Sequence, residues 1–201
     1  MSEHWNQVYD TREPDQVSWF EPEPTTSLEL LEILGATPED SVIDVGAGES
    51  LLSDRLRSRG YTDITLLDIS ASALAQRIAR MGDDVVTVLE ADVTTWVPQR
   101  HYDLWHDRAV LHFLSAEGAQ RYAATLRRAL SPNGGVVIGV FSPEGPTSCS
   151  GLEVTRYSAE QLGELLGDDF ELVTARRVSH LTPWGTQQSF QWIAARRRAR
   201  A

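Results

Sequence analysis

The stretch that decides the fold is "SVIDVGAGESLLSDRLRSRG", Ser41–Gly60. Its first five residues are mostly apolar and β-branched, which predicts a buried strand over 41–45. Gly46 and Gly48 follow directly, and leucines four residues apart then indicate one face of a helix that ends at Gly60. Glycine permits positive φ and a close approach of the backbone to a ligand. We therefore expect a βαβ unit with a binding site at the end of its first strand.

The rest of the chain repeats this alternation of strand and helix patterns. We expect strands at 63–68, 85–90, 102–107 and 136–141, and helices at 70–81, 116–130 and from Ser158, with Gly82 ending the first of these helices. The last two strand patterns, 170–179 and 187–197, are joined by too few residues for a crossover helix, so they are expected to pair antiparallel. The sequence predicts an α/β fold, a Rossmann-like, doubly wound, seven-stranded sheet with helices on both faces and a C-terminal antiparallel hairpin.

The chain has 201 residues, and its composition suits one domain over 1–201. Within it, 1–36 is expected to form an N-terminal flap and helix outside the sheet, and 41–201 the core. The flap carries Trp19 and Phe20 in a proline-bounded loop. Such a loop either closes over a site or anchors the segment to the core, and the sequence leaves both open.

Charge and cysteine content exclude several classes of function. The net charge of −11 disfavours a nucleic-acid partner, because binding to phosphates depends on basic residues. There is no apolar run of about 18 residues and no signal-peptide pattern, so we expect a cytoplasmic protein with no membrane partner. The single cysteine, Cys149, excludes an internal disulfide and a cysteine-built metal site, and we expect no metal. A monomer and a homodimer both remain open.

A second sign of a ligand is Asp68, which ends the second strand 20 positions after Gly48. A carboxylate there can accept hydrogen bonds from both hydroxyls of a ribose, as in NAD, FAD or S-adenosylmethionine. Leu51 stands where a dinucleotide site has its third glycine, and Glu49 would place a negative charge beside a pyrophosphate. Together with Asp44, Glu49 better suits a cofactor that carries an amino group and a sulfonium cation.

At this point the chain resembles a known family, the class I S-adenosylmethionine-dependent methyltransferases. Its first, second and third motifs are matched by "VIDVGAGES" (42–50), "LLDIS" (66–70) and "EADVTTW" (90–96). "HWNQVY", "YDLWHDRAVLHFL", "CSGLEVTRY" and "HLTPWGTQQSF" are similar to a branch of small bacterial methyltransferases that resembles thiopurine-type and small-molecule methyltransferases. The resemblance implies S-adenosyl-L-methionine as cofactor and S-adenosyl-L-homocysteine as product. The cofactor-binding residues it implies are Trp19, Asp44, Gly46, Ala47, Gly48, Asp68, Ile69, Asp92 and Val93.

Candidates for catalysis follow the fourth strand, in "WHDRAVLHF". They are His106, Asp107, Arg108 and His112. Asp107 or Arg108 is expected to fix the cofactor or the substrate, and His106 or His112 is expected near the acceptor. An internal ion pair that holds the loop is an equal alternative for the first three, and a satisfied core histidine is an equal alternative for His112.

Candidates for substrate binding are Phe20, Arg156, His180 and Trp184. Arg156 can clamp a substrate carboxylate with two hydrogen bonds or form a surface salt bridge. A hydrogen bond to the hairpin turn is the simpler role of His180.

These patterns predict an enzyme that transfers a methyl group from S-adenosylmethionine to an O, N or S atom of a small molecule. The alternatives are a protein lysine methyltransferase and a cofactor-binding module without catalysis. A nicotinamide-dependent oxidoreductase is disfavoured by the missing third glycine.

Overall fold

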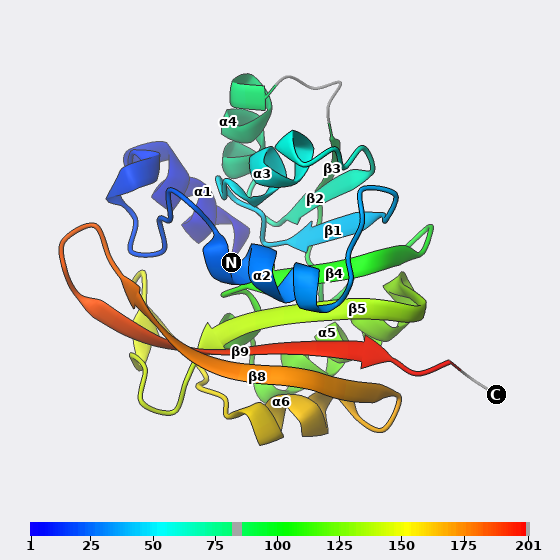
Figure 1. The fold of residues 1–201 in the computed structure, drawn as a ribbon. Helices are drawn as coiled ribbons and strands as arrows, with labels where there is room; N and C mark the ends of the chain where they lie inside the picture. Colours follow the sequence, from blue (N-terminus) through cyan, green and yellow to red (C-terminus); the bar gives the residue numbers. More distant parts are fainter. Residues whose placement is uncertain (82–85, 200–201) are drawn as a thin grey trace.

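The computed structural model of the chain describes residues 1–81 and 86–199. A seven-stranded sheet in the order β3-β2-β1-β4-β5-β9-β8 forms its centre (Figure 1). Its strands are β1 (Val42–Val45), β2 (Ile64–Asp68), β3 (Thr87–Glu90), β4 (Tyr102–Arg108), β5 (Leu130–Phe141), β8 (Phe170–Leu181) and β9 (Gln187–Arg197). β3, β2, β1, β4 and β5 pair parallel, while β9 lies antiparallel between β5 and β8. The predicted fold class, including the antiparallel hairpin at the end, is confirmed.

Helices cover both faces of this sheet. They are α1 (Ser2–Thr11), α2 (Thr25–Ile33), α3 (Leu52–Ser58), α4 (Ala71–Met81), α5 (Ala116–Ala129) and α6 (Ala159–Leu166). Two single turns, η1 (Pro14–Gln16) and η3 (Leu111–Phe113), and a small hairpin of β6 (Ser148–Cys149) and β7 (Leu152–Glu153) complete the described elements. None of the described helices is both long and apolar enough to cross a membrane.

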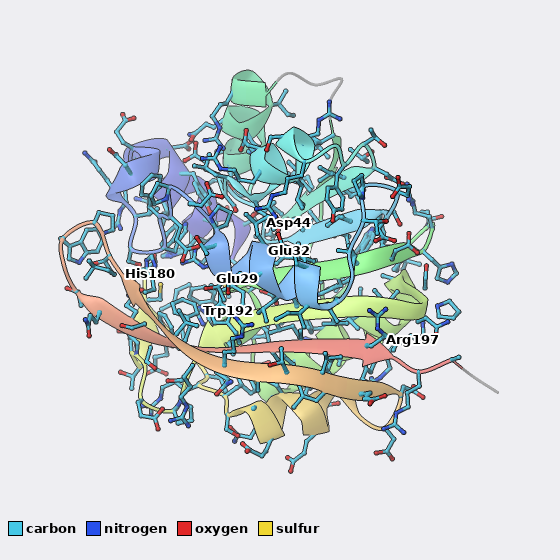
Figure 2. All side chains as sticks on the ribbon, in the orientation of Figure 1. Glu29, Glu32, Asp44, His180, Trp192 and Arg197 are labelled. Carbon is cyan, nitrogen blue, oxygen red and sulfur yellow. The ribbon has the colours of Figure 1, made fainter. Side chains whose placement is uncertain are left out.

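The two faces of the sheet carry separate hydrophobic cores, because successive strand residues point to opposite sides. Ile43 and Val136 pack with α5 and α6, whereas their neighbours Val42 and Val137 pack with α2, α3 and α4. Trp192 lies on the face that α2 covers, and α2 passes in front of the strands (Figures 1 and 2). The central strands are therefore buried on both sides, which is why they are continuous apolar runs in the sequence.

The elements differ from the prediction mainly at the junction of α5 with β5 and at α1. α5 ends at Ala129, and β5 begins at Leu130 rather than at 136. The intervening "SPNGG" stays within the strand because Asn133 takes a φ of 64° and the β4–β5 register shifts there. "HWNQVY" lies within α1, a helix for which the sequence analysis assigned no element. The expected helix end at Gly82 and the first residue of the expected third strand lie outside the described residues.

Candidate active site

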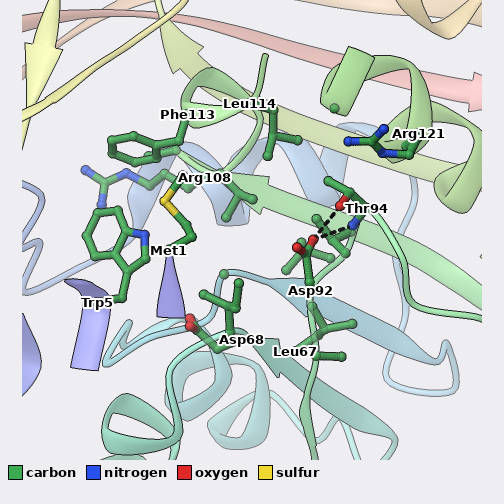
Figure 3. A pocket seen from close by; sticks show the side chains of 18 of the residues that line it. Met1, Trp5, Leu67, Asp68, Asp92, Thr94, Arg108, Phe113, Leu114 and Arg121 are labelled. Atoms are coloured by element: carbon green, nitrogen blue, oxygen red, sulfur yellow. Dashed lines mark hydrogen bonds between the residues drawn. The ribbon is translucent and has the colours of Figure 1, made fainter. Parts of the chain in front are cut away.

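A cavity of about 410 Å³ lies at the carboxyl ends of β1, β2 and β4, where α/β sheets bind their ligands. Gly46, Asp68 and Arg108 from the ends of these strands form part of its wall. Asp92 and Thr94 lie on one side in Figure 3, and Trp5, Arg108 and Phe113 lie on the other. The cavity therefore has a polar end beside β2 and β3 and an aromatic end beneath α1.

Asp68 is held rigidly at the edge of this cavity. Its carboxylate accepts a hydrogen bond of 2.8 Å from the N–H of Gly48 and one of 2.9 Å from the N–H of Ser70. Burial raises the pKa of Asp68 to about 6, although the hydrogen bonds from Ser70 and Gly48 oppose this rise. These two backbone N–H groups fix the orientation of the carboxylate at the cavity edge. Such a group suits the two hydroxyls of a ribose.

The next strand end supplies a second carboxylate and apolar walls. Asp92 accepts hydrogen bonds of 2.8 Å and 2.7 Å from the N–H and the hydroxyl of Thr94. The apolar side chains of Ile69, Val93 and Leu114 line the same cavity. A flat, polar-edged ring such as adenine fits between walls of this kind.

The glycine turn after β1 brings the backbone close to two side chains. Gly46 and Gly48 have φ values of 67° and 47°, in the left-handed region. A Cβ atom on Gly46 would overlap Val110, and one on Gly48 would overlap the hydroxyl of Tyr9. Glycine is therefore required at both positions, for conformation and for space.

A smaller cavity of about 50 Å³ adjoins the first and shares Tyr9, Trp19, Gly46 and Arg108 with it. Asp44 lines it and is 3% exposed. Its Oδ1 pairs with His106 Nδ1 at 2.7 Å, whereas its Oδ2 has no partner among the described residues.

Arg108 lines the same smaller cavity. Its Nη1 donates to the carbonyl of Trp19 at 2.5 Å, and its Nη2 lies 3.1 Å from Glu21 Oε1. Burial lowers the pKa of the Arg108 guanidinium, and the charge of Glu21 opposes this. Its Nε is buried without a partner among the described residues.

These two unpartnered atoms test whether an amino acid group fits the smaller cavity. Among the described residues that line it, Asp44 Oδ2 is a buried free acceptor and Arg108 Nε is a buried free donor. A buried polar atom without a partner is unfavourable, so both atoms favour a ligand that satisfies them. An α-ammonium and an α-carboxylate group are the complement of this pair.

The N-terminal flap covers the aromatic end of the larger cavity. The ring centroids of Trp5 and Phe113 are 4.9 Å apart, those of Trp5 and Trp19 are 5.9 Å apart, and those of Tyr9 and Trp19 are 6.3 Å apart. Their edge-to-face arrangement is favourable for aromatic rings. The sequence left open whether Trp19 closes a site or anchors the flap, and in the structure it lies in this wall while Arg108 binds its carbonyl.

The flap is also anchored on both sides of the cavity. Gln76 of α4 donates to the carbonyl of Tyr9 at 2.9 Å. On the other side, His180 Nε2 lies 2.7 Å from the carbonyl of Ser18, and its Nδ1 lies 3.3 Å from Glu21 Oε1. Hydrogen bonds from α4 and β8 thus hold the flap over the strand ends.

The four candidates for catalysis do not form one cluster, which corrects the expectation from "WHDRAVLHF". β4 continues to Arg108, so His106 and Arg108 point to the α2 face and Asp107 to the α5 face. Asp107 accepts hydrogen bonds from the N–H groups of Val110 (2.8 Å) and Leu111 (3.2 Å), and burial raises its pKa to about 6.

His106 and His112 also lie outside the larger cavity. Both ring nitrogens of His106 have partners, Asp44 and Ser27. His112 is fully buried, and its Nδ1 accepts a hydrogen bond of 3.3 Å from the N–H of Phe141. Burial, together with the charge of Arg108, lowers the pKa of His112 to about 3. Of the four candidates, only Arg108 lines the larger cavity.

The candidates for substrate binding are likewise spread out. Phe20 lines the smaller cavity, and His180 lines a third cavity of about 260 Å³ beside Glu21. Arg156 donates to the carbonyl of Pro143 at 2.7 Å, and Trp184 is 57% exposed in the β8–β9 turn. Neither Arg156 nor Trp184 lines any of the three cavities described.

Several residues that line these cavities are not among the candidates predicted from the sequence. Trp5 and Tyr9 stand four apart in α1, a spacing that places both rings on one helical face. That spacing in "HWNQVY" was the available signal. Glu21, Ser27 and Phe113 carried no comparable signal, because their positions depend on how α2 and η3 pack on the sheet.

Comparisons with known proteins agree with this geometry. Residues 42–134 match the model of a family described as "Methyltransferase domain". The chain is 32% identical over 83 residues to the eEF1A lysine and N-terminal methyltransferase of Mus musculus. That match covers 40% of this chain and 11% of the relative, so the chain spans only about a ninth of that protein's length.

Solved structures share the fold over nearly the full chain. One, described for the conversion of a disulfide bond into a thioacetal group during echinomycin biosynthesis, has a TM-score of 0.78 and 19% identity, and covers 100% of this chain and 94% of that one. The 1,6-didemethyltoxoflavin-N1-methyltransferase of Burkholderia thailandensis, with bound S-adenosylhomocysteine, has a TM-score of 0.71 and 21% identity, and covers 98% and 84%.

The sheet order gives the chain the Rossmann-like fold that the solved N1-methyltransferase structure shares. Residues 42–134 are thus similar to a methyltransferase domain, as the resemblance in the sequence implied, and the Burkholderia thailandensis methyltransferase with this fold holds S-adenosylhomocysteine.

Proposed function

We propose that this protein is an enzyme that transfers a methyl group from S-adenosylmethionine to an O, N or S atom of a small molecule. The observation that carries the proposal is the pair of adjoining cavities. Together they combine the fixed carboxylate of Asp68, the unpartnered atoms of Asp44 and Arg108, and an aromatic end. The N1-methyltransferase of Burkholderia thailandensis, whose structure holds the small molecule 1,6-didemethyltoxoflavin, supports this choice of substrate class.

Each part of the cofactor has residues to hold it. Asp68, Asp92 and Val93 line the larger cavity, where Asp68 would accept hydrogen bonds from the ribose hydroxyls and Asp92 and Val93 would lie beside the adenine. Asp44 Oδ2, a buried acceptor without a partner among the described residues, would accept from the ammonium group, and Arg108 Nε, a buried donor in the same state, would donate to the carboxylate. When bound, S-adenosylmethionine supplies a methyl group that its positively charged sulfur has already activated.

On the acceptor side, the aromatic residues position the substrate and exclude water. Trp5, Trp19 and Phe113 form the wall at that end, and their faces suit a flat or cationic group. Methyl transfer requires an acceptor lone pair in line with the methyl group, at a distance of about 3 Å. Because neither His106 nor His112 lines this cavity, we assign the rate enhancement to positioning rather than to a histidine base.

We further propose that the protein is a bacterial, cytoplasmic monomer or homodimer with no nucleic-acid partner. Its single cysteine suits a reducing compartment, and a net charge of −11 opposes binding to phosphates.

Two alternatives remain for the test. The relative from Mus musculus is named for methylation of a protein, but the match covers only 40% of this chain. A binding module without catalysis would keep the cofactor residues and show no turnover.

The decisive experiment has two steps. Calorimetric titration with S-adenosylhomocysteine, on the wild type and on Asp68→Ala, tests the cofactor site. Transfer of a labelled methyl group from S-adenosylmethionine is then measured with a panel of small aromatic amines, phenols and thiols, and with lysine-rich peptides. Binding that Asp68→Ala abolishes, with labelling of small molecules only, supports the proposal. Labelling of peptides only would overturn the substrate class, and binding without any turnover would favour the non-catalytic module.

A further inference from the structure

Three buried side chains form a hydrogen-bonded series that joins α2, β4 and β1. Ser27 Oγ lies 2.9 Å from His106 Nε2, and His106 Nδ1 lies 2.7 Å from Asp44 Oδ1. Ser27, His106 and Asp44 are 1%, 2% and 3% exposed. Asp44 and His106 are direct neighbours in the parallel pairing of β1 with β4. All three residues line the smaller cavity.

The chemistry of each group sets the direction of these hydrogen bonds. A carboxylate only accepts, so the N–H at Nδ1 of His106 donates to Asp44 Oδ1. In the neutral ring, Nε2 then accepts from the hydroxyl of Ser27. The series therefore occupies one oxygen of Asp44 and leaves Oδ2 without a partner among the described residues.

Folding alone does not account for this arrangement. Burial of a carboxylate with an unpartnered oxygen opposes folding, and apolar side chains could fill the same space without that cost. A cationic group at Asp44 Oδ2 removes the difficulty. The smaller cavity that Asp44 lines is the place for such a group.

We propose that Ser27 and His106 are positioning residues that act through Asp44, orienting its second carboxylate oxygen to accept from the α-ammonium group of the cofactor. The inference rests on the proposed function, because it takes the methionine part of S-adenosylmethionine as the occupant of the smaller cavity. In this proposal His106 contributes to cofactor binding through Asp44 and takes no part in proton transfer to or from the acceptor.

Three ligands separate this role from a general effect on folding. S-adenosylhomocysteine carries both the ammonium and the carboxylate group, its decarboxylated form carries only the ammonium group, and 5′-methylthioadenosine carries neither. Their dissociation constants are measured by calorimetry on the wild type, His106→Asn and His106→Gln. The amide nitrogen of asparagine can replace Nδ1 and reach Asp44, whereas that of glutamine replaces Nε2 and reaches only Ser27.

The expected result is a loss that depends on both the ligand and the variant. His106→Gln weakens binding of the two ammonium-bearing ligands about tenfold, the lower end of the loss that follows replacement of residues that orient metal ligands. It changes binding of 5′-methylthioadenosine by less than about twofold. His106→Asn keeps most of the affinity for all three ligands.

Two further variants keep the test decisive if His106→Gln does not fold. Ser27→Ala removes one end of the series. It is expected to weaken binding of the ammonium-bearing ligands selectively, by a smaller factor than His106→Gln does. Thr65→Val is the matched control, because Thr65 is also a fully buried hydroxyl residue but lies on β2 outside the series. It should leave the affinity for every ligand unchanged.

Equal losses for all three ligands, or wild-type affinities in His106→Gln and Ser27→Ala, would overturn the positioning role. A different failure, in which the wild type binds none of the three ligands, would overturn the proposed function itself.

Discussion

The backbone N–H of Gly48 donates a hydrogen bond of 2.8 Å to Asp68 Oδ2, across 20 residues of sequence. This bond connects the glycine turn after β1 with the end of β2, the two motifs from which the cofactor was first inferred. It keeps the carboxylate at the cavity edge while burial raises the pKa of Asp68 to about 6. We therefore expect ligand binding at this cavity to depend on pH slightly below neutrality.

Affinity for S-adenosylhomocysteine should depend on the ionisation of Asp68. In the proposed site the ionised carboxylate would accept hydrogen bonds from the ribose, so binding should favour the deprotonated form. Affinity is then constant well above pH 6 and falls by up to about tenfold per pH unit below that pKa. Calorimetry between about pH 5 and pH 7.5 measures this. In Asp68→Asn the affinity should be low and nearly independent of pH. If the affinity of Asp68→Asn fell with pH as steeply as that of the wild type, the role of Asp68 in ribose binding would be refuted.

Gly48→Ala should destabilise the protein by about 2–4 kcal/mol, because the new methyl group overlaps the Tyr9 hydroxyl and the residue keeps a positive φ. Tyr9→Phe removes that hydroxyl, so the same alanine in the Tyr9→Phe background should cost only about 1–2 kcal/mol. Urea unfolding of the double-mutant cycle gives both values.

Gly35→Ala is the matched control for this cycle. Gly35 also has a positive φ, 69°, but among the described residues, its own two chain neighbours aside, no heavy atom lies within 4 Å of its Cβ position. Its cost should be the same with Tyr9 or Phe at position 9. A Gly48→Ala cost that is also independent of residue 9 would show that the two residues are not coupled.

Arg108→Lys should loosen the flap and weaken cofactor binding. The guanidinium reaches the carbonyl of Trp19 and the carboxylate of Glu21 at once, and a single ammonium group does not replace this geometry. We expect about tenfold weaker binding of S-adenosylhomocysteine. Hydrogen exchange of the loop around Trp19 should become faster. Arg177→Lys, which changes an exposed pair with Glu144, is the control and should alter neither quantity.

His112 should make the protein less stable in acid. Its pKa is lowered to about 3, so the folded state binds fewer protons than the unfolded chain between about pH 3 and pH 6.5. The free energy of unfolding is therefore unaffected by His112 above about pH 6.5. Below that pH the unfolded chain takes up the proton, so the free energy of unfolding falls by at most about 1.4 kcal/mol per pH unit. His112→Asn keeps an acceptor for the Phe141 N–H but does not titrate.

Urea unfolding at several pH values, compared between the wild type and His112→Asn, isolates this contribution. Asp107, whose raised pKa acts in the opposite direction, is present in both proteins and cancels in the difference. Parallel stability curves for the two proteins would contradict the buried, neutral state of His112.

Local patterns predicted the architecture because each depends on neighbouring residues. The continuous apolar run at 42–45 indicated a strand buried on both sides, and the short connection before β9 excluded a parallel crossover. The site was predicted less completely. Asp68 was recognisable from its distance to the glycine turn, but the grouping of His106, Asp107 and Arg108 did not allow for a strand that continues to Arg108 and alternates between faces.

The sequence by itself determined the order of the strands of the main sheet and of most helices, the glycine turn and the acid that ends β2, because steric limits on the backbone and the periodicity of burial act over a few residues. Only the tertiary structure decided which side chains meet. Asp44 and His106 are 62 residues apart and Ser27 lies 79 residues before His106, yet sheet pairing and the packing of α2 bring them into contact. Trp5 and Phe113 likewise meet over the cavity only because α1 docks there. Such contacts arise from the packing of whole elements, which no local pattern encodes.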